Sequence, residues 1–405
     1  MSHKLNPAGC GHVGANTAPA STAVAPENAA EPQETAAQRV CMLMTRLCAA
    51  LIALLLSACG GGGAVSDPPP PPVAPQPLPP VSPPDFGAVS NEVERWTVND
   101  AAVLIGTAEG ELYRYEKGAL RADTQLNIAS ASKWLTGMTV WSLVESGSLS
   151  LDTQPQDHVA FWSSDPDDPR SAVTLEHLLS FRSGFNSRPS LDSCPGDRSL
   201  SLEACIRSLH DAGVQTAPGA AFAYGPDHMQ IAALVTREAT GRELSDHMRA
   251  RIWEPSGVSA RTAFPSTADN VRYSGGIRST AEDYGRILSA LMAGDLVSLE
   301  SGFLSERTSR SQTAYTIPAM DELTLDWRYG FGAWVECDTV PFSQACNTDP
   351  TVSSPGAYGF LPWIDLEAGY WAVIAIDEPL SRAPRPSVAA IELQQILQPL
   401  IAAEF

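Results

Sequence analysis

The chain has 405 residues, a formal net charge of −20 at pH 7 and 44% hydrophobic residues. This length and composition are typical of a globular protein with one large core or two closely packed subdomains. The acidic excess disfavours binding to a phosphate backbone, so we expect no nucleic-acid partner.

The N-terminal part carries targeting signals. Residues 1–43 are polar and rich in alanine, and we interpret them as an unstructured leader or a wrongly assigned start. Residues 44–58 hold an apolar run too short to span a bilayer, which is typical of a signal peptide. The run ends in Leu-Ser-Ala-Cys59, which resembles a bacterial lipobox and implies lipidation of the Cys59 thiol. We therefore expect a lipoprotein of the bacterial cell envelope, anchored to a membrane and facing the periplasm.

A linker separates this anchor from the folded part. Residues 59–85 are dominated by glycine and then by proline. Such a composition favours an extended chain and cannot bury a core. We therefore assign the globular domain to residues 86–405.

Strand patterns lie at both ends of the globular domain. The predicted strands, rich in aromatic and β-branched residues, are Ala101–Thr107, Glu111–Tyr115, Gly330–Val335, Ala357–Ile364 and Tyr370–Ile376. The apolar spacing over Ser387–Ala403 predicts a closing helix. The residues between these flanks are mostly helical or loop-like in pattern. We therefore expect an α/β (α+β) fold, with an antiparallel sheet, terminal helices and an inserted, mainly helical subdomain.

Ser130 and Lys133 are three positions apart, which places them on one face of a helix. An apolar stripe follows and ends near Gly147, so the pattern predicts a helix with Ser130 at its N-terminus. A free lysine has a pKa of about 10.4 and is a poor base at neutral pH. Burial beside the positive end of a helix would lower that pKa. The spacing alone is weak evidence, because it occurs by chance in many chains.

Four further motifs follow Lys133 along the chain. They are Val173–Phe185 (VTLEHLLSFRSGF), Pro218–Tyr224 (PGAAFAY), Arg251–Pro255 (RIWEP) and Ser274–Asp283 (SGGIRSTAED). With the Ser130 motif they resemble, in the same order, the serine β-lactamase-like group of class C β-lactamases, D,D-peptidases and family VIII esterases. The resemblance covers the chain from about Ala101 to Ile376. It implies the same fold, with the site in a cleft between the sheet and the helical subdomain.

The resemblance also implies roles for individual residues. Ser130 would attack an ester or amide carbonyl, Lys133 would take its proton, and Tyr224 would share in the proton relay. The oxyanion would be bound by the Ser130 N–H and by the Ala357 N–H, which follows the triplet Ser354-Pro355-Gly356. We expect no cofactor and no metal, because the chain has no Cys-x-x-Cys and no His-Glu-x-x-His.

Two positions depart from the group's pattern. The asparagine expected two residues after the tyrosine is Pro226, and the cationic or imidazole residue of the triplet is Ser354. Both positions help the group to bind a substrate amide and a terminal carboxylate, so their change favours the esterase branch. Arg278 or Arg328 could supply a replacement cation, although most arginines are solvated or packed along their stems.

Four cysteines remain beyond the leader and Cys59. Their close spacing and an oxidising compartment favour two disulfides, Cys194 with Cys205 and Cys337 with Cys346. A metal site is the alternative for these residues.

Three functions compete. The leading hypothesis is a monomeric, esterase-like serine hydrolase that acts on a small ester or amide. The second is a D,D-peptidase or β-lactamase that acts on cell-wall peptides or β-lactams. The third is a non-catalytic lipoprotein that binds peptidoglycan, but such a module would have no need for Ser130, Lys133 and Tyr224 together.

Overall fold

The computed structural model describes residues 83–185, 194–308, 313–315 and 317–405, all within the unit Val81–Phe405. The predictions on the leader, the signal peptide and Cys59 fall on residues outside these ranges. In the described ranges, no helix combines the length and the apolar character that crossing a membrane requires.

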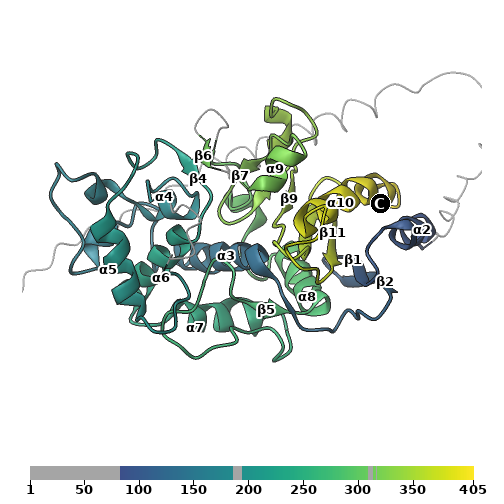
Figure 1. Cartoon of the computed structure of the whole chain (residues 1–405), viewed down its shortest axis with the longest axis horizontal. Helices are drawn as coiled ribbons and strands as arrows, with labels where there is room; N and C mark the ends of the chain where they lie inside the picture. Colours follow the sequence, from purple (N-terminus) through teal and green to yellow (C-terminus); the bar gives the residue numbers. More distant parts are fainter. Residues whose placement is uncertain (1–82, 186–193, 309–312, 316) are drawn as a thin grey trace, which may run out of the picture. The chain divides into compact units, whose positions relative to one another are not determined.

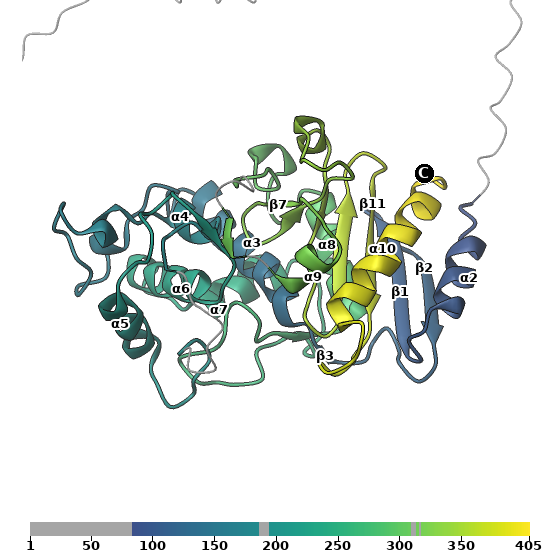
Figure 2. The same ribbon diagram turned by 45° about the horizontal axis from the view of Figure 1, so that its top comes forward.

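Seven strands form one antiparallel sheet in the order β2-β1-β11-β10-β9-β8-β7 (Figures 1 and 2). They are β1 (Ala101–Thr107), β2 (Gly110–Lys117), β7 (Arg328–Tyr329), β8 (Trp334–Val335), β9 (Thr351–Ser353), β10 (Leu361–Asp365) and β11 (Tyr370–Ala375). The first strand pairs directly with the last, with Ala102 opposite Ala375. The two ends of the domain therefore build one sheet, and the middle of the chain is an insertion, as the sequence predicted.

Two predicted strands begin too early. Only Trp334–Val335 of the segment 330–335 is a strand, because Gly332 has a φ of 94° and the chain bends there. The segment 357–364 becomes a strand only at Leu361. A turn precedes it, in which Gly359 has a φ of 92°.

Helices cover both faces of the sheet. The bounds are α2 (Gly87–Arg95), α8 (Ala281–Met292) and α10 (Pro386–Ala402). Tyr370 and Trp371 are neighbours on β11 and therefore point to opposite faces. Trp371 donates to Ser289 Oγ of α8 at 2.8 Å, whereas Tyr370 stacks on Phe405, just after α10. Hence α8 covers one face and α10, which packs on α2, covers the other.

The helical subdomain is enclosed by a short antiparallel pair, β3 (Leu126–Asn127) and β5 (Arg278–Ser279). Its helices are α3 (Ser132–Glu145), α4 (Leu175–Leu179), α5 (Leu202–Ala212), α6 (Asp227–Thr240) and α7 (Leu244–Met248), followed by a π-helical turn, Arg249–Trp253. The smaller elements of this subdomain are β4 (Phe222–Ala223) and the 3₁₀ turns Ala129–Ala131, Pro155–Asp157 and Pro169–Ala172. After β5 come the small elements β6 (Thr313–Tyr315), α9 (Pro318–Glu322) and the 3₁₀ turns Leu299–Ser301 and Gln344–Asn347. Nearly every side chain of α3 is buried, so this helix is enclosed on all sides and lies between α6, α7 and the π-helical turn.

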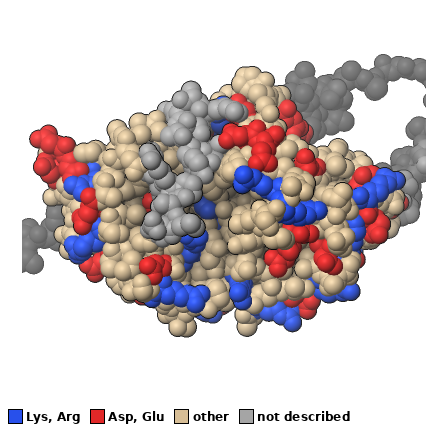
Figure 3. All heavy atoms as spheres, viewed as in Figure 1, with Lys and Arg blue, Asp and Glu red and all other residues tan. Residues whose placement is uncertain are grey.

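Both disulfides form as predicted, Cys194 with Cys205 and Cys337 with Cys346. On the surface, acidic and basic side chains are interspersed over the face shown in Figure 3. Among the described residues, several charged side chains form ion pairs, such as Arg114 with Glu111 at 2.8 Å and Arg237 with Asp269 at 3.1 Å. Exposed pairs of this kind add at most about 1 kcal/mol each to stability, so the core and not the charge pattern holds the fold.

Candidate active site

Ser130 lies in the 3₁₀ turn that leads into α3, and Lys133 lies in the first turn of that helix. Lys133 Nζ is 3.1 Å from Ser130 Oγ, within hydrogen-bonding distance. The preceding residue, Ala129, has a φ of 46°, a left-handed conformation that costs energy for any residue with a Cβ. The backbone is therefore strained at the point where it presents the Ser130 hydroxyl, which is partly exposed while Lys133 is buried.

The Lys133 amine is set apart from water. Its side chain is only 5% exposed, Nζ donates to the Ser274 carbonyl oxygen at 2.7 Å, and Nζ lies 4.7 Å from the centre of the Tyr224 ring. Burial, and next the positive charge of Arg272, lower the pKa of Lys133 from 10.5 to about 7. About half of the amine is therefore neutral at pH 7 and can accept a proton. Burial was expected from the sequence, whereas the contribution of Arg272 was not.

Tyr224 completes the cluster, and several aromatic rings pack around its side chain. The ring is buried and stacks on Trp334 at 5.5 Å between centroids, with Tyr329 and Phe181 also in contact. These rings come from β7, β8 and the segment after α4, so the tertiary fold brings Tyr224 to the amine of Lys133.

His228, which lacks any ligand spacing in the sequence, supports β4, the strand that ends just before Tyr224. It is fully buried and stacks on Phe181 at 4.7 Å. Its Nε2 is 2.8 Å from the Ala223 carbonyl oxygen, and its Nδ1 is 2.8 Å from Ser183 Oγ. Burial lowers the pKa of His228 to about 4, so the ring is neutral: Nε2–H donates to Ala223, and Nδ1 accepts from Ser183. No periodicity or motif signals this role.

The segment Ser354–Ala357, which directly follows β9, packs against the turn that carries Ser130. Ser354 Oγ donates to the Ser130 carbonyl oxygen at 3.2 Å. A Cβ on Gly356 would lie 2.3 Å from the Ile128 carbonyl oxygen, so only glycine permits this approach. Ala357 follows in a partly exposed turn. The structure therefore brings Ser354 and Gly356 to the turn that carries Ser130, although they are more than 200 positions away along the chain.

The two departures from the group's pattern have a structural setting. Pro226 is the residue before the first turn of α6, and Ser354 is buried. Both suggested replacement cations have a partner within the fold. Arg278 Nε donates to Asn127 Oδ1 at 3.0 Å, and Arg328 Nη1 pairs with Asp326 at 3.3 Å. Arg272, which no sequence pattern singled out, is the arginine whose charge reaches Lys133.

Histidine and metal chemistry do not enter this cluster. His177 Nδ1 accepts from the Thr174 N–H at 3.2 Å and caps α4, which is a structural role. Within the described ranges there is no group of three or more His, Cys, Asp or Glu side chains placed to hold a metal ion. The arrangement supports nucleophilic chemistry based on a serine and a neutral amine.

Known proteins share this architecture. In the putative beta-lactamase of Bacteroides dorei, 22% identical, the fold superposes with a TM-score of 0.65 over 78% of this chain and 99% of that one. Penicillin-binding protein 4 of Amycolatopsis lactamdurans is 28% identical over 163 residues, 40% of this chain and 42% of its own length. Lovastatin esterase of Penicillium rubens is 27% identical over 212 residues, 46% of this chain and 52% of its own.

The chain thus spans about half the length of the curated relatives that it matches. A profile of the Beta-lactamase family matches far more, from residue 90 to residue 394. That match includes the sheet, the helical subdomain and every residue of the cluster described above. The chain belongs to the Beta-lactamase family.

Proposed function

We propose that the protein is a serine hydrolase that cleaves esters or small amides through an acyl-enzyme on Ser130. The observation that carries this proposal is the pair of Ser130 Oγ and Lys133 Nζ at 3.1 Å, with the pKa of Lys133 lowered to about 7. A nucleophilic serine needs a base within hydrogen-bonding reach whose pKa lies near the working pH. The pair meets both conditions.

In the first step the neutral Lys133 amine takes the Ser130 hydroxyl proton as Oγ bonds to the substrate carbonyl carbon. The carbonyl oxygen becomes an oxyanion, which the N–H groups of Ser130 and Ala357 stabilise. The C–O or C–N bond then breaks, and the leaving group takes up the proton by way of Lys133 and Tyr224. Water attacks the acyl-enzyme next, releases the acid and returns the proton to Ser130.

We place the enzyme closer to the esterases than to the β-lactamases of its family. Pro226 and Ser354 supply neither the side-chain amide nor the cation that the wider group uses for an amide and a terminal carboxylate. Each lost charge-assisted hydrogen bond weakens binding of such a substrate by about 1.5–3 kcal/mol, whereas a neutral ester loses little. The relative named lovastatin esterase supports this choice, and the relative named penicillin-binding protein 4 supports the peptidase alternative.

The test uses covalent labelling. Purified wild type, Ser130→Ala and the control Ser146→Ala, an exposed serine at the end of the same helix, are incubated with a fluorophosphonate and with labelled penicillin. Mass mapping should find the fluorophosphonate on the Ser130 peptide of wild type and Ser146→Ala, and no adduct in Ser130→Ala. Short p-nitrophenyl esters should have a higher kcat/KM than nitrocefin. Efficient nitrocefin turnover without esterase activity would select the β-lactamase alternative, and wild-type turnover by Ser130→Ala would exclude the mechanism.

We also propose that the mature protein is a monomeric lipoprotein held to the cell-envelope membrane through Cys59. The Leu-Ser-Ala-Cys59 motif and the Gly/Pro-rich linker after it support the anchor. The two disulfides support an oxidising compartment such as the periplasm.

A further inference from the structure

Arg272 lies beside the turn that carries the nucleophile. The glycine that follows it by three positions, Gly275, marks the contact: a Cβ there would be 3.6 Å from the Ala129 carbonyl oxygen and 3.8 Å from Arg272 Cδ. The stem of Arg272 and the backbone of that turn therefore both lie next to Gly275. Arg272 as a whole residue is exposed.

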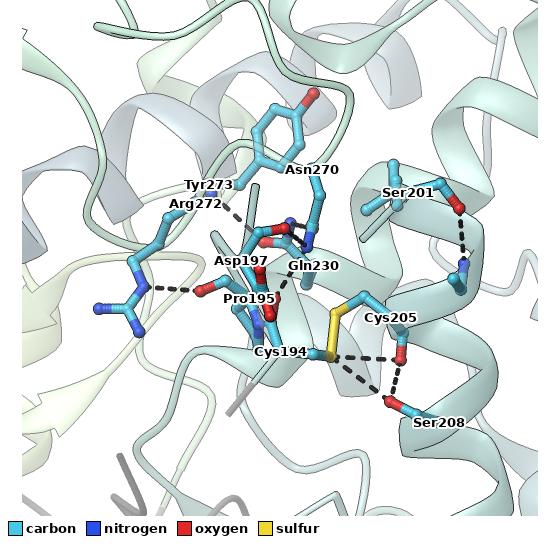
Figure 4. The surroundings of a disulfide bond; sticks show 12 residues. Cys194, Pro195, Asp197, Ser201, Cys205, Ser208, Gln230, Asn270, Arg272 and Tyr273 are labelled. Carbon is cyan, nitrogen blue, oxygen red and sulfur yellow. Dashed lines mark hydrogen bonds between the residues drawn. A yellow bond between two sulfur atoms is a disulfide. The ribbon is translucent and has the colours of Figure 1, made fainter. Parts of the chain in front are cut away.

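A polar network holds the backbone of this arginine in place (Figure 4). Asn270 Nδ2 donates to the carbonyl oxygens of Cys194 at 2.8 Å and Asp197 at 3.0 Å, and Gln230 Nε2 donates to Asn270 Oδ1 at 2.7 Å. The disulfide between Cys194 and Cys205 joins the loop that contains Cys194 and Asp197 to α5. The segment that carries Arg272 is therefore joined to two helices before it reaches the site.

The guanidinium itself is only partly used. Arg272 Nε donates to the Pro195 carbonyl oxygen at 3.1 Å, which fixes the plane of the group. Figure 4 shows the rest of the guanidinium extending away from the disulfide. In the part of the chain that the structure describes, no carboxylate forms an ion pair with Arg272, in contrast to Arg328 and Asp326. The two Nη groups thus present a planar pair of donors, the geometry that binds a carboxylate in a bidentate manner.

We propose that Arg272 forms an anion subsite beside Ser130, and that the preferred substrates are esters that carry a carboxylate near the scissile bond. The inference rests on the proposed function and adds a substrate class to it. The cation comes from the segment 270–276 and not from the strand edge, where Ser354 stands. We therefore expect the carboxylate of a flexible ester to reach it, and the ring-fixed carboxylate of a β-lactam to remain a poor match.

The test compares two pairs of substrates at pH 9, which lies above the pKa of about 7 of Lys133 in wild type. One pair has the charge on the acyl side: mono-p-nitrophenyl glutarate and p-nitrophenyl butyrate. The other has it on the leaving group: 4-acetoxybenzoate and phenyl acetate. Arg272→Gln should lower kcat/KM for the charged member of at least one pair by about tenfold more than for its neutral partner, which reports any effect of the change on Lys133. Arg272→Lys, which keeps the charge but not the fork, should fall between wild type and Arg272→Gln.

Arg278→Gln is the matched control, since it removes one exposed positive charge from the same part of the chain. It should leave the preference of wild type unchanged. Added salt should reduce the preference of wild type for the charged ester, a measurement that needs no variant. The anion subsite alone is overturned if Arg272→Gln changes kcat/KM equally for the charged and the neutral esters, or if salt has no effect on the preference of wild type. A wild-type protein that cleaves none of the four esters overturns the proposed function and the subsite together.

Discussion

Replacing Lys133 by methionine should stabilise the protein at neutral pH while abolishing its activity. Methionine has a similar length and fits an apolar setting. Lys133 is 5% exposed and its pKa is lowered from 10.5 to about 7, so the folded state disfavours the ammonium. The unfolded chain binds a proton there between about pH 7 and 10.5 and the folded chain does not, and stability therefore rises with pH over this window.

The size of the effect follows from the two pKa values. The pKa of Lys133 falls from 10.5 in the unfolded chain to about 7 in the folded chain. Compared with a residue that is neutral in both states, this lowers the free energy of unfolding by roughly 4 kcal/mol at pH 7 and by roughly 1 kcal/mol at pH 9.5. The methionine leaves the Ser274 carbonyl oxygen without its donor, which costs about 1–3 kcal/mol at any pH. The variant should therefore gain about 2 kcal/mol at pH 7 and lose that advantage by pH 9.5.

Calorimetric melting of wild type and Lys133→Met at pH 7 and at pH 9.5 measures this directly. The Tm of the variant should be higher by a few degrees at pH 7 and equal or lower at pH 9.5. Ester hydrolysis by the variant should be lost, and kcat/KM of wild type should rise with pH through about 7. A variant that is less stable than wild type by the same margin at both pH values would refute the argument that the buried amine is costly.

Three further predictions concern other parts of the chain. Burial raises the pKa of Glu336 from 4.5 to about 7, so the folded state keeps a proton there that the unfolded state has lost, and stability falls as the pH rises through this window. The Tm advantage of Glu336→Gln over wild type should accordingly be larger at pH 8 than at pH 5, and an equal difference at both would contradict the protonated carboxyl. Gly356→Ala should lower kcat by about 100-fold with a smaller effect on KM, because its Cβ would push the strand edge away from Ile128; unchanged kcat would remove Ala357 from the oxyanion site. Cys59→Ser should move the protein from the membrane fraction to the soluble fraction, and its retention with membranes would exclude the lipid anchor.

The local features of the site could be predicted from the sequence because short spacing decides them. Ser130 and Lys133 meet since one helical turn separates them, and α3 begins and ends close to where its apolar stripe does. The cysteines of each disulfide are only 11 or 9 positions apart, so few other pairings were available in an oxidised domain. Both termini of the sheet and the closing helix also follow from periodicity.

The remaining features depend on contacts between distant segments. Ser354 and Ser130 are 224 positions apart, and no local pattern states that their backbones touch. The first residues assigned to two strands were wrong, because Gly332 and Gly359 adopt positive φ. The tertiary packing around these glycines decides their conformation, and β-propensity does not predict it.

The same holds for the electrostatics. The motif names Lys133 as a base, but its pKa is set by burial and by Arg272, which lies 139 positions further along the chain. Burial and the distance between charges are properties of the folded chain, and a sequence records neither. The sequence by itself thus pointed to Ser130, Lys133 and Tyr224, and the tertiary structure decided the protonation of Lys133 and which arginine charge acts on it.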